Sequence, residues 1–459
     1  MEVIIVIALT GVAIMMAGAF NKPGLSLWLA IAGLMLGFIL NIRLWNADQH
    51  LLNDMIVYDN YAVAFNGLII LSSALVFLLF HSHYAPWEKH LDEIAALLVF
   101  STTSMLLMTS FGNLVILFIG IETLSICLYV LTASRKYELP SNEAALKYFL
   151  LGSFATGVML FGIALIYGAS GSFDFHEITA YLAANANQAN NMFCTGLLLL
   201  TVGLLFKIAA VPFHFWAPDV YEGSPTVITT FMASVVKIAG VAAIYRLYAF
   251  HFAAIKPVWA NTIMTVSALS FILAVLLALP QKRFKRMLAY SGISHAGFLL
   301  LAVLALNQYS ASALLLYAVS YSLATIMAFT VLVEMIEVKW SDELNVFKGM
   351  AAKNKFLAFA LIIAMLSMAG IPPLSGFMAK FTMFKTVAES GYIVLVVLAV
   401  LASAVSLVYY LKPISLILTK DESNAVKVKL SAEVIIVLSI CLLLTFVFGI
   451  FPGLLTGLF

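Results

Sequence analysis

Four ionisable side chains lie deep inside long apolar stretches of this 459-residue chain: Glu122, Lys207, Lys237 and His295. If those stretches are helical, with a rise of about 1.5 Å per residue, each side chain lies about 15 to 22 Å from the nearest polar boundary. A charge in hydrocarbon costs at least about 2.5 to 3.5 kcal/mol, and ionisable groups placed there commonly line ion or proton paths. Their common depth predicts a polar row that can accept and release protons.

Lys207 stands just before a break in its apolar stretch. Between positions 197 and 210 only Thr201, Gly203 and Lys207 are not apolar. Pro212 has no amide hydrogen, so the carbonyl of Ile208 loses its helical partner beside the lysine. Inside a bilayer, water or protein must satisfy such a backbone group. About ten residues, or roughly 15 Å, separate Lys207 from the nearest boundary, which disfavours a lysine that reaches the headgroups.

The apolar stretch between positions 355 and 388 contains a second break with a lysine close to it. An apolar half-helix runs into Gly370, Pro372, Pro373 and Gly376, and Lys380 comes next. Two other lysines, Lys147 and Lys385, are close to the ends of their apolar stretches. For these two, reaching the headgroups is at least as good an interpretation as a buried role.

The composition excludes a soluble globular protein. Hydrophobic residues make up 63% of the chain and charged residues 10%, and the mean hydropathy is +1.07. The net charge of +2 gives no indication of nucleic-acid binding. The three cysteines have no paired spacing, so neither a disulfide framework nor a metal site is predicted. We predict an all-α polytopic membrane protein whose first apolar stretch is a retained helix, because Glu2 stands where a signal peptide would be basic.

The predicted membrane spans number fourteen: 2–20, 25–41, 60–80, 92–110, 112–134, 143–168, 192–222, 226–250, 258–279, 284–306, 310–338, 355–388, 391–418 and 431–451. An even number of crossings puts both termini on one side. With the termini outside, the inward loops carry most of the basic residues, as the positive-inside rule requires. These inward residues are Lys22, Lys89, Arg135, Lys136, Lys282, Arg283, Lys285, Arg286, Lys339, Lys348, Lys353, Lys355, Lys412, Lys420, Lys427 and Lys429, against Arg43, Arg246 and Lys256 in outward loops.

The two broken helices, seven and twelve, are each fourth in a block of five and cross in opposite directions. This order predicts two inverted five-helix repeats, at 92–250 and 258–418, flanked by helices one to three at 1–91 and by helix fourteen at 431–459. The polar segments at 41–60 and 168–191 are too short for folded domains. All predicted chemistry therefore lies within the membrane.

The chain has no recognisable motif for flavin, NADH or iron–sulfur clusters. His81, His83 and His90 cluster near the end of the third span, but no carboxylate or cysteine stands at ligand spacing from them. We interpret this cluster as an interfacial loop and predict no metal site and no cofactor bound by this chain.

Four stretches together resemble one family: IGIETLSICLYVL around Glu122, EAALKYFLLGSFATGVMLFGIALIYGASGS around Lys147, FKIAAVPFHFWAPDVYEGSPTVITTFMASVVKIAG around Lys207 and Lys237, and KRMLAYSGISHAGF around His295. They are similar to the antiporter-like membrane subunits of the proton-pumping NADH:quinone oxidoreductase, respiratory complex I. The similarity covers nearly the whole chain. It favours the subunit N type, because the chain is short, has no long lateral arm, and has Lys380 where the middle subunit would have glutamate.

The resemblance implies roles for individual residues. Glu122 and Lys207 would form a pair, Lys237 would be the central lysine, and Lys380 would end the proton path. His295, His214 and Lys147 are weaker candidates for the same path. The resemblance also implies partner subunits that hold flavin, iron–sulfur clusters and quinone, and a place in the bacterial inner membrane.

Two alternatives use the same sequence features. A multisubunit cation/proton antiporter has the same fold without redox partners. A purely structural subunit of a membrane arm would make the buried charges dispensable.

Overall fold

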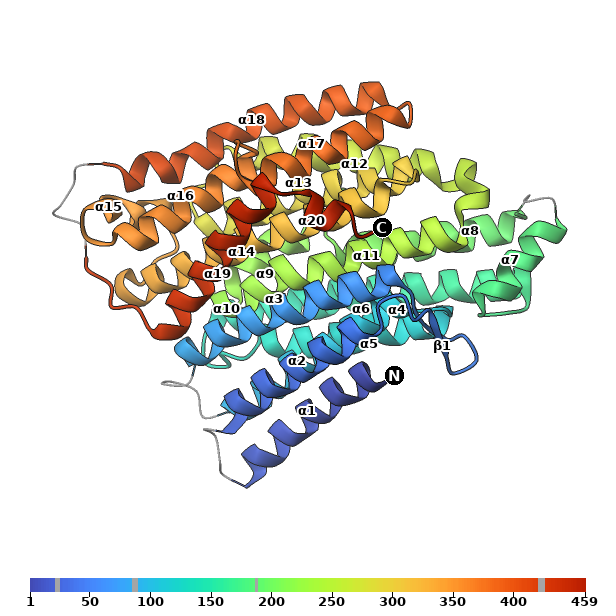
Figure 1. Ribbon diagram of the computed structural model, residues 1–459, viewed down its shortest axis with the longest axis horizontal. Helices are drawn as coiled ribbons and strands as arrows, with labels where there is room; N and C mark the ends of the chain where they lie inside the picture. The colour runs from blue at the N-terminus through green and yellow to red at the C-terminus, as the bar shows by residue number, and fades with distance from the viewer. Residues whose placement is uncertain (21–24, 85–89, 186–188, 420–425) are drawn as a thin grey trace.

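The computed structural model describes residues 1–20, 25–84, 90–185, 189–419 and 426–459. Its helices lie side by side in one bundle, with a single two-stranded hairpin at one end (Figure 1). The elements are α1 (Glu2–Ala19), α2 (Ser26–Arg43), β1 (Gln49–Leu51), β2 (Ile56–Tyr58), α3 (Asn60–Tyr84), α4 (Leu91–Ser110), α5 (Leu114–Thr132), α6 (Leu139–Ser170), α7 (Phe175–Ala184), α8 (Asn191–Lys207), α9 (Trp216–Gly223), α10 (Thr226–Phe231), η2 (Met232–Val236), α11 (Lys237–Arg246), η3 (Leu247–His251), η4 (Ala253–Ile255), α12 (Lys256–Ala278), α13 (Phe284–Ala305), α14 (Ser310–Lys339), η5 (Leu344–Phe347), α15 (Met350–Lys353), α16 (Lys355–Ala369), α17 (Ser375–Glu389), α18 (Ile393–Ile417), α19 (Ala432–Ile450) and α20 (Gly453–Thr456).

Several helices begin where the sequence supplies a side chain that accepts a hydrogen bond from the first turn. An oxygen of such a residue satisfies one of the amides that a helix start leaves without a partner. The caps are Asn113 for α5, Asp174 for α7, Asn190 for α8 and Ser431 for α19.

Fourteen membrane crossings are present in the described residues. Twelve helical segments are long and apolar enough to span a bilayer by themselves. The other two crossings are discontinuous: the short apolar helices α8 and α16 are each followed by a break and then by a second half, α9 and α17. The fold class predicted from the sequence is confirmed.

The two broken helices run in opposite directions. In Figure 1, α8 begins at the end of the bundle where α7 lies, whereas α16 begins at the opposite end, beside α15. This is the arrangement expected for inverted repeats.

The core of the bundle is formed by helices that are buried on all sides. Residues 227–248, and residues 312–335 of α14, are buried throughout, and α13 is almost so. Helices α1, α12 and α18 expose more than half of their spans, and large apolar side chains such as Val394 point outward. An apolar outer surface is stable in contact with lipid, which explains the hydropathy of the whole chain.

One end of the bundle contains structure in segments that the sequence analysis described only as polar loops. Strands β1 and β2 form an antiparallel hairpin in the segment 41–60, and α7 forms in the segment 168–191. Both termini lie at this end: Ile4 packs against the small cluster of Ile56, Tyr58 and Val63, and Phe459 contacts Tyr61 at the start of α3.

The assignment of Arg246 to an outward loop was wrong. Arg246 lies in the last turn of α11, with 2% of its surface exposed, and forms an ion pair with Asp59 at 3.0 Å. Its Nε also donates to the carbonyl of Phe111 at 2.9 Å. A buried guanidinium needs such partners. Of the other basic residues counted by loop, Lys22, Lys89 and Lys420 lie outside the described residues.

Candidate functional site

Lys207 is the last residue of α8 and is 6% exposed. Its ammonium donates to the hydroxyl of Ser125 at 2.9 Å and to that of Tyr148 at 3.4 Å. Ser125 stands on α5 one turn after Glu122, whose charge acts on the lysine. Among the described side chains, however, Glu122 and Lys207 form no direct ion pair. Glu122 is partly exposed, and Ser125 contacts the lysine in its place.

The break after Lys207 is filled by protein groups. The indole of Trp216 donates to the carbonyl of Phe206 at 3.0 Å, and the amide of Val211 donates to the hydroxyl of Ser270 at 2.9 Å. Ala209 takes a left-handed conformation with φ of 57°. These contacts satisfy backbone groups that an unbroken helix would have paired internally.

His214 lies within this break and is 5% exposed. Its ring contacts that of Phe215 in a tilted arrangement, with the ring centroids 4.4 Å apart, and its Nδ1 has no hydrogen-bond partner among the described residues. The structure therefore places His214 beside the break and shows no hydrogen bond that joins it to the buried lysines.

Lys237 begins α11 directly after the π-helical turn η2 and is 2% exposed. A π turn inside an α-helix shifts the side chains that follow it, and such turns occur frequently at functional sites. A Cβ atom on Gly292 would lie 2.9 Å from the ammonium nitrogen and 3.0 Å from the hydroxyl of Tyr321. A larger residue at 292 would therefore crowd the Lys237 side chain. The ammonium itself has no hydrogen-bond partner among the described residues.

Lys207 and Lys237 belong to elements that touch. A Cβ atom on Gly240, one turn after Lys237, would lie 2.6 Å from a methyl group of Ile208, the residue after Lys207. The small residue lets the end of α8 approach α11 closely, which brings the two lysine-bearing elements together.

His295 is 4% exposed on α13, and both of its ring nitrogens contact tyrosines. Nδ1 lies 2.9 Å from the hydroxyl of Tyr317, and Nε2 lies 3.0 Å from that of Tyr410. Lys237 and Lys380 both act on it electrostatically, and His295 and Lys380 line the same narrow cavity. His295 thus connects the central lysine to the second broken helix.

Lys380 is 6% exposed on α17 and has polar partners, as expected from its position after a break. Its ammonium donates to the carbonyl of Ala369 at 3.0 Å and to the hydroxyl of Ser403 at 2.8 Å. It also lies 5.7 Å from the centroid of the Phe298 ring, within the range of a cation–π contact. The Lys380 ammonium thus supplies a hydrogen-bond donor to the Ala369 carbonyl, at the end of α16.

Lys147 does not belong to the buried row. It is 42% exposed and pairs with Glu143 at 2.8 Å and with Asp219 at 3.0 Å. Lys385 is also exposed and lies 3.8 Å from Glu389. Both lysines lie on the surface of the bundle, in agreement with their positions near the ends of apolar stretches.

Lys147 instead lines a charged cleft of about 590 Å3 at the end of the bundle opposite the hairpin. Arg286 joins its two sides, donating to Asp219 at 2.8 Å and to Glu222 at 2.7 Å. Burial raises the pKa of the Asp342 carboxyl at the edge of this cleft, although nearby Lys285 opposes the shift. Sequence reasoning missed this cleft, because its charges come from four segments and each looks like an ordinary loop residue.

A second buried pair was also missed. His83 Nε2 lies 3.2 Å from Glu334 on α14, and both side chains are almost fully buried. The interpretation of this histidine as part of an interfacial loop was wrong, because His83 is buried in the last turn of α3 and its carboxylate partner is far away along the chain.

Comparison with known proteins decides the family. A family model described as "NADH:quinone oxidoreductase/Mrp antiporter, TM" matches residues 110–406, which is more than half of the chain. The chain belongs to this family. A relative from Flavobacterium psychrophilum called NADH-quinone oxidoreductase subunit N is 39% identical over 458 residues, 99% of each chain. A relative of the same name from Cytophaga hutchinsonii is 40% identical over 401 residues, 87% of each chain.

Two solved structures have the same fold. A chain of respiratory complex I from Thermus thermophilus with bound Aureothin is 32% identical, with a TM-score of 0.85 over 99% of this chain and 98% of that one. A chain of the Mrp complex from Dietzia sp. has a TM-score of 0.86 over 99% of this chain and 95% of that one, at 19% identity. The latter likeness concerns the fold alone. The resemblance inferred from the quoted stretches is confirmed.

Proposed function

We propose that this chain is a proton-translocating, antiporter-like membrane subunit of an NADH:quinone oxidoreductase. The observation that carries the proposal is the series of three almost fully buried lysines: Lys207 and Lys380 on the two broken helices, and Lys237 directly after a π turn. Ammonium groups in an apolar interior are costly in their charged form and can lose a proton, unlike arginine. His295 supplies a titratable group between the central lysine and Lys380.

Proton movement along this row would depend on electrostatic coupling. A carboxylate near an ammonium stabilises its protonated form, whereas burial favours its neutral form. If Glu122 approached Lys207 the lysine would hold its proton, and if the carboxylate moved away the proton would pass toward Lys237. Ionisable groups that interact strongly titrate as a coupled set, and in this proposal the row would act as one unit.

The electrons would be handled in partner subunits. The relatives bear the name of an NADH–quinone oxidoreductase, an activity that uses flavin, iron–sulfur clusters and quinone, and we assign these to other subunits. We also propose that the chain lies in the bacterial inner membrane with both termini on the periplasmic side. The basic residues of the charged cleft, at the end opposite the termini, support this orientation.

A second candidate is a subunit of a multisubunit cation/proton antiporter. The family model covers both kinds of complex, and the fold of the Mrp chain matches over nearly its whole length. The higher identity to relatives called subunit N favours the oxidoreductase.

The test is NADH-driven proton uptake by inverted membrane vesicles, normalised to the amount of assembled complex. Lys380→Met removes a buried ammonium, and Lys385→Met on the same helix removes an exposed one, which makes it a matched control. We expect the first variant to assemble but lose most proton uptake per NADH oxidised, and the second to equal the parent. Equal uptake in both variants would contradict the proposal, and recovery of the chain as an active antiporter without redox partners would favour the second candidate.

A further inference from the structure

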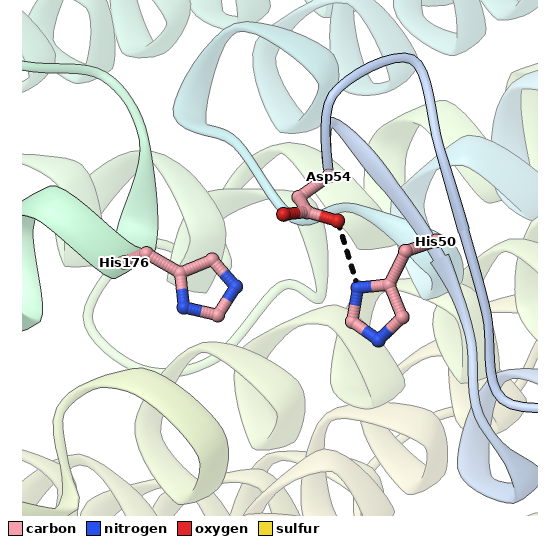
Figure 2. A group of neighbouring side chains, drawn as sticks. All are labelled: His50, Asp54 and His176. Carbon is pink, nitrogen blue, oxygen red and sulfur yellow. Dashed lines mark ion pairs between the residues drawn. The ribbon is translucent and has the colours of Figure 1, made fainter.

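Three potential metal-binding side chains meet at the end of the bundle that holds both termini. Figure 2 shows His50 on β1, Asp54 in the hairpin turn and His176 in the first turn of α7. One ligand atom from each lies within 4.8 Å of the other two, and His50 Nδ1 is 3.0 Å from a carboxylate oxygen of Asp54. None of the three belongs to the buried lysine row.

The set has the composition of a transition-metal site. Two imidazoles and one carboxylate suit zinc, copper or nickel, whereas magnesium and calcium prefer oxygen ligands alone. Tetrahedral ligands at about 2.0 to 2.1 Å from zinc lie roughly 3.3 Å apart. The three ligand atoms lie within 4.8 Å of one another, so metal binding requires the more distant ones to move closer by at most about 1.5 Å. His50 and His176 are exposed, which leaves a fourth position open to water.

A further carboxylate lies behind one of the ligands. The other ring nitrogen of His50, Nε2, is 3.9 Å from Asp48. At 3.9 Å Asp48 forms no hydrogen bond with this ring, but it is placed where a closer approach would fix the orientation of a ligating histidine and strengthen the ligand. A simple ion pair between His50 and Asp54 explains neither this carboxylate nor the position of His176.

The backbone holds the two sides of the site in place. On one side, the amide of Gly112 donates to the carbonyl of Met55 at 2.9 Å, next to the hairpin turn. On the other side, Asn113 forms a β-bridge with Asp174, whose side chain accepts the amide of His176 at 2.8 Å. The hairpin and the start of α7 are therefore both attached to the short connection between α4 and α5.

We propose that His50, Asp54 and His176 bind a divalent transition-metal ion, with zinc as the expected ion, and that the ion clamps the hairpin to α7. The ion would join segments more than a hundred residues apart in the sequence, so its binding should suppress local opening of both. This inference concerns a different part of the chain from the proton row and does not depend on the proposed function.

The test is hydrogen–deuterium exchange of the purified complex, with micromolar zinc, with magnesium and without added metal. We expect zinc alone to slow exchange severalfold in peptides covering residues 49–58 and 173–180. The variants His50→Gln and His176→Gln should lose this protection. His90→Gln is the matched control, because His90 is an exposed histidine that pairs with Glu93 and lies outside this cluster, and it should keep the protection.

A change of metal preference tests the ligand directly. His176→Cys replaces a nitrogen ligand by a soft sulfur ligand, so it should keep zinc-dependent protection and gain protection by cadmium. Zinc without effect on the parent, or an equal effect on the parent and on His176→Gln, would overturn the proposal.

Discussion

The two broken helices use one backbone design for two different purposes. Ala209 and Gly370, which are 161 positions apart (370 − 209), both have positive φ and both donate to the carbonyl three residues earlier. In each break the next amide donates five residues back, from Ala210 to Leu205 and from Ile371 to Leu366. The same spacing relates positions 212 and 373, both proline and both preceded by a cis peptide bond. The repeat is thus visible in the backbone although the side chains differ.

The charges occupy different places in the two breaks. Lys207 precedes the first break, and the position equivalent to it in the second, 368 (207 + 161), is methionine. Lys380 follows the second break, and its equivalent in the first, 219 (380 − 161), is the aspartate that faces the charged cleft. One backbone fold therefore supports a lysine on either side of the break, and the surroundings decide its role.

The largest loss of proton uptake is expected when the lysine at either break is replaced by a side chain that is permanently charged. Lys207→Arg and Lys380→Arg keep a positive charge and much of the length, but a guanidinium does not release its proton in proteins. We expect both variants to assemble and to lose most NADH-driven proton uptake in vesicles, and Lys207→Ala to behave like Lys207→Arg. If the arginine variant at only one break pumps at the parent rate, that lysine has an electrostatic role and the two breaks are not equivalent in function.

A smaller effect is expected from the acidic neighbour that distinguishes the first break. Glu122 acts on Lys207 without forming a direct ion pair, whereas no carboxylate among the described residues has such an effect on Lys380. Glu122→Gln keeps the shape and removes the charge, so proton uptake should fall severalfold while Lys207 stays in place. Glu93→Gln, which changes an exposed carboxylate, is the control and should leave the rate unchanged.

Replacing the residue with positive φ in each break by the residue found in the other break should affect thermal stability differently. Gly370→Ala places a Cβ in the left-handed conformation, at a cost of roughly 1 to 2 kcal/mol. It also brings that Cβ to 3.0 Å from the Lys380 side chain. Ala209→Gly relieves the same conformational cost at the first break. Thermal inactivation of the solubilised complex should occur at a lower temperature for Gly370→Ala and at an unchanged or higher one for Ala209→Gly; the reverse order would mean that the two backbones are not equivalent.

The smallest effect is expected at Lys147, which pairs with the residue equivalent to Lys380. Lys147→Gln removes a partly exposed ion pair, and such pairs contribute little. Proton uptake should stay close to that of the parent, because Arg286 still contacts Asp219. A loss as large as that in Lys207→Ala would place the charged cleft on the proton path.

Much of the fold could be predicted from local features of the sequence. Hydropathy located the spans, and the prolines at 212 and 373 located both breaks, because a missing amide acts within one turn. The depth of Lys207, Lys237 and Lys380 followed from counting residues along each helix. These are properties of a single helix, and they need no knowledge of its neighbours.

The contacts of those lysines could not be predicted in the same way. The π turn before Lys237 leaves no mark in the hydropathy pattern, and it changes where that side chain points. The tyrosines around His295 come from two other helices, and each would pass for an ordinary aromatic core residue. The same applies to the ion pair of Asp59 and Arg246, which is formed by residues 187 positions apart. Such pairings depend on which helices pack together, and the local patterns of a single sequence do not show this.

The hydrogen bond from Lys380 to the carbonyl of Ala369 bears on which ion the site selects. In transporters with discontinuous helices, carbonyls at the end of a half-helix coordinate sodium ions. Here that position is occupied by a cation that is covalently attached to the chain. An alkali ion would compete with this tethered charge for the same oxygen and would be repelled by it, whereas a proton can leave the ammonium without displacing any heavy atom. On the proposed proton path, this amine would therefore disfavour sodium at the Ala369 carbonyl by competition and would leave the proton free to exchange.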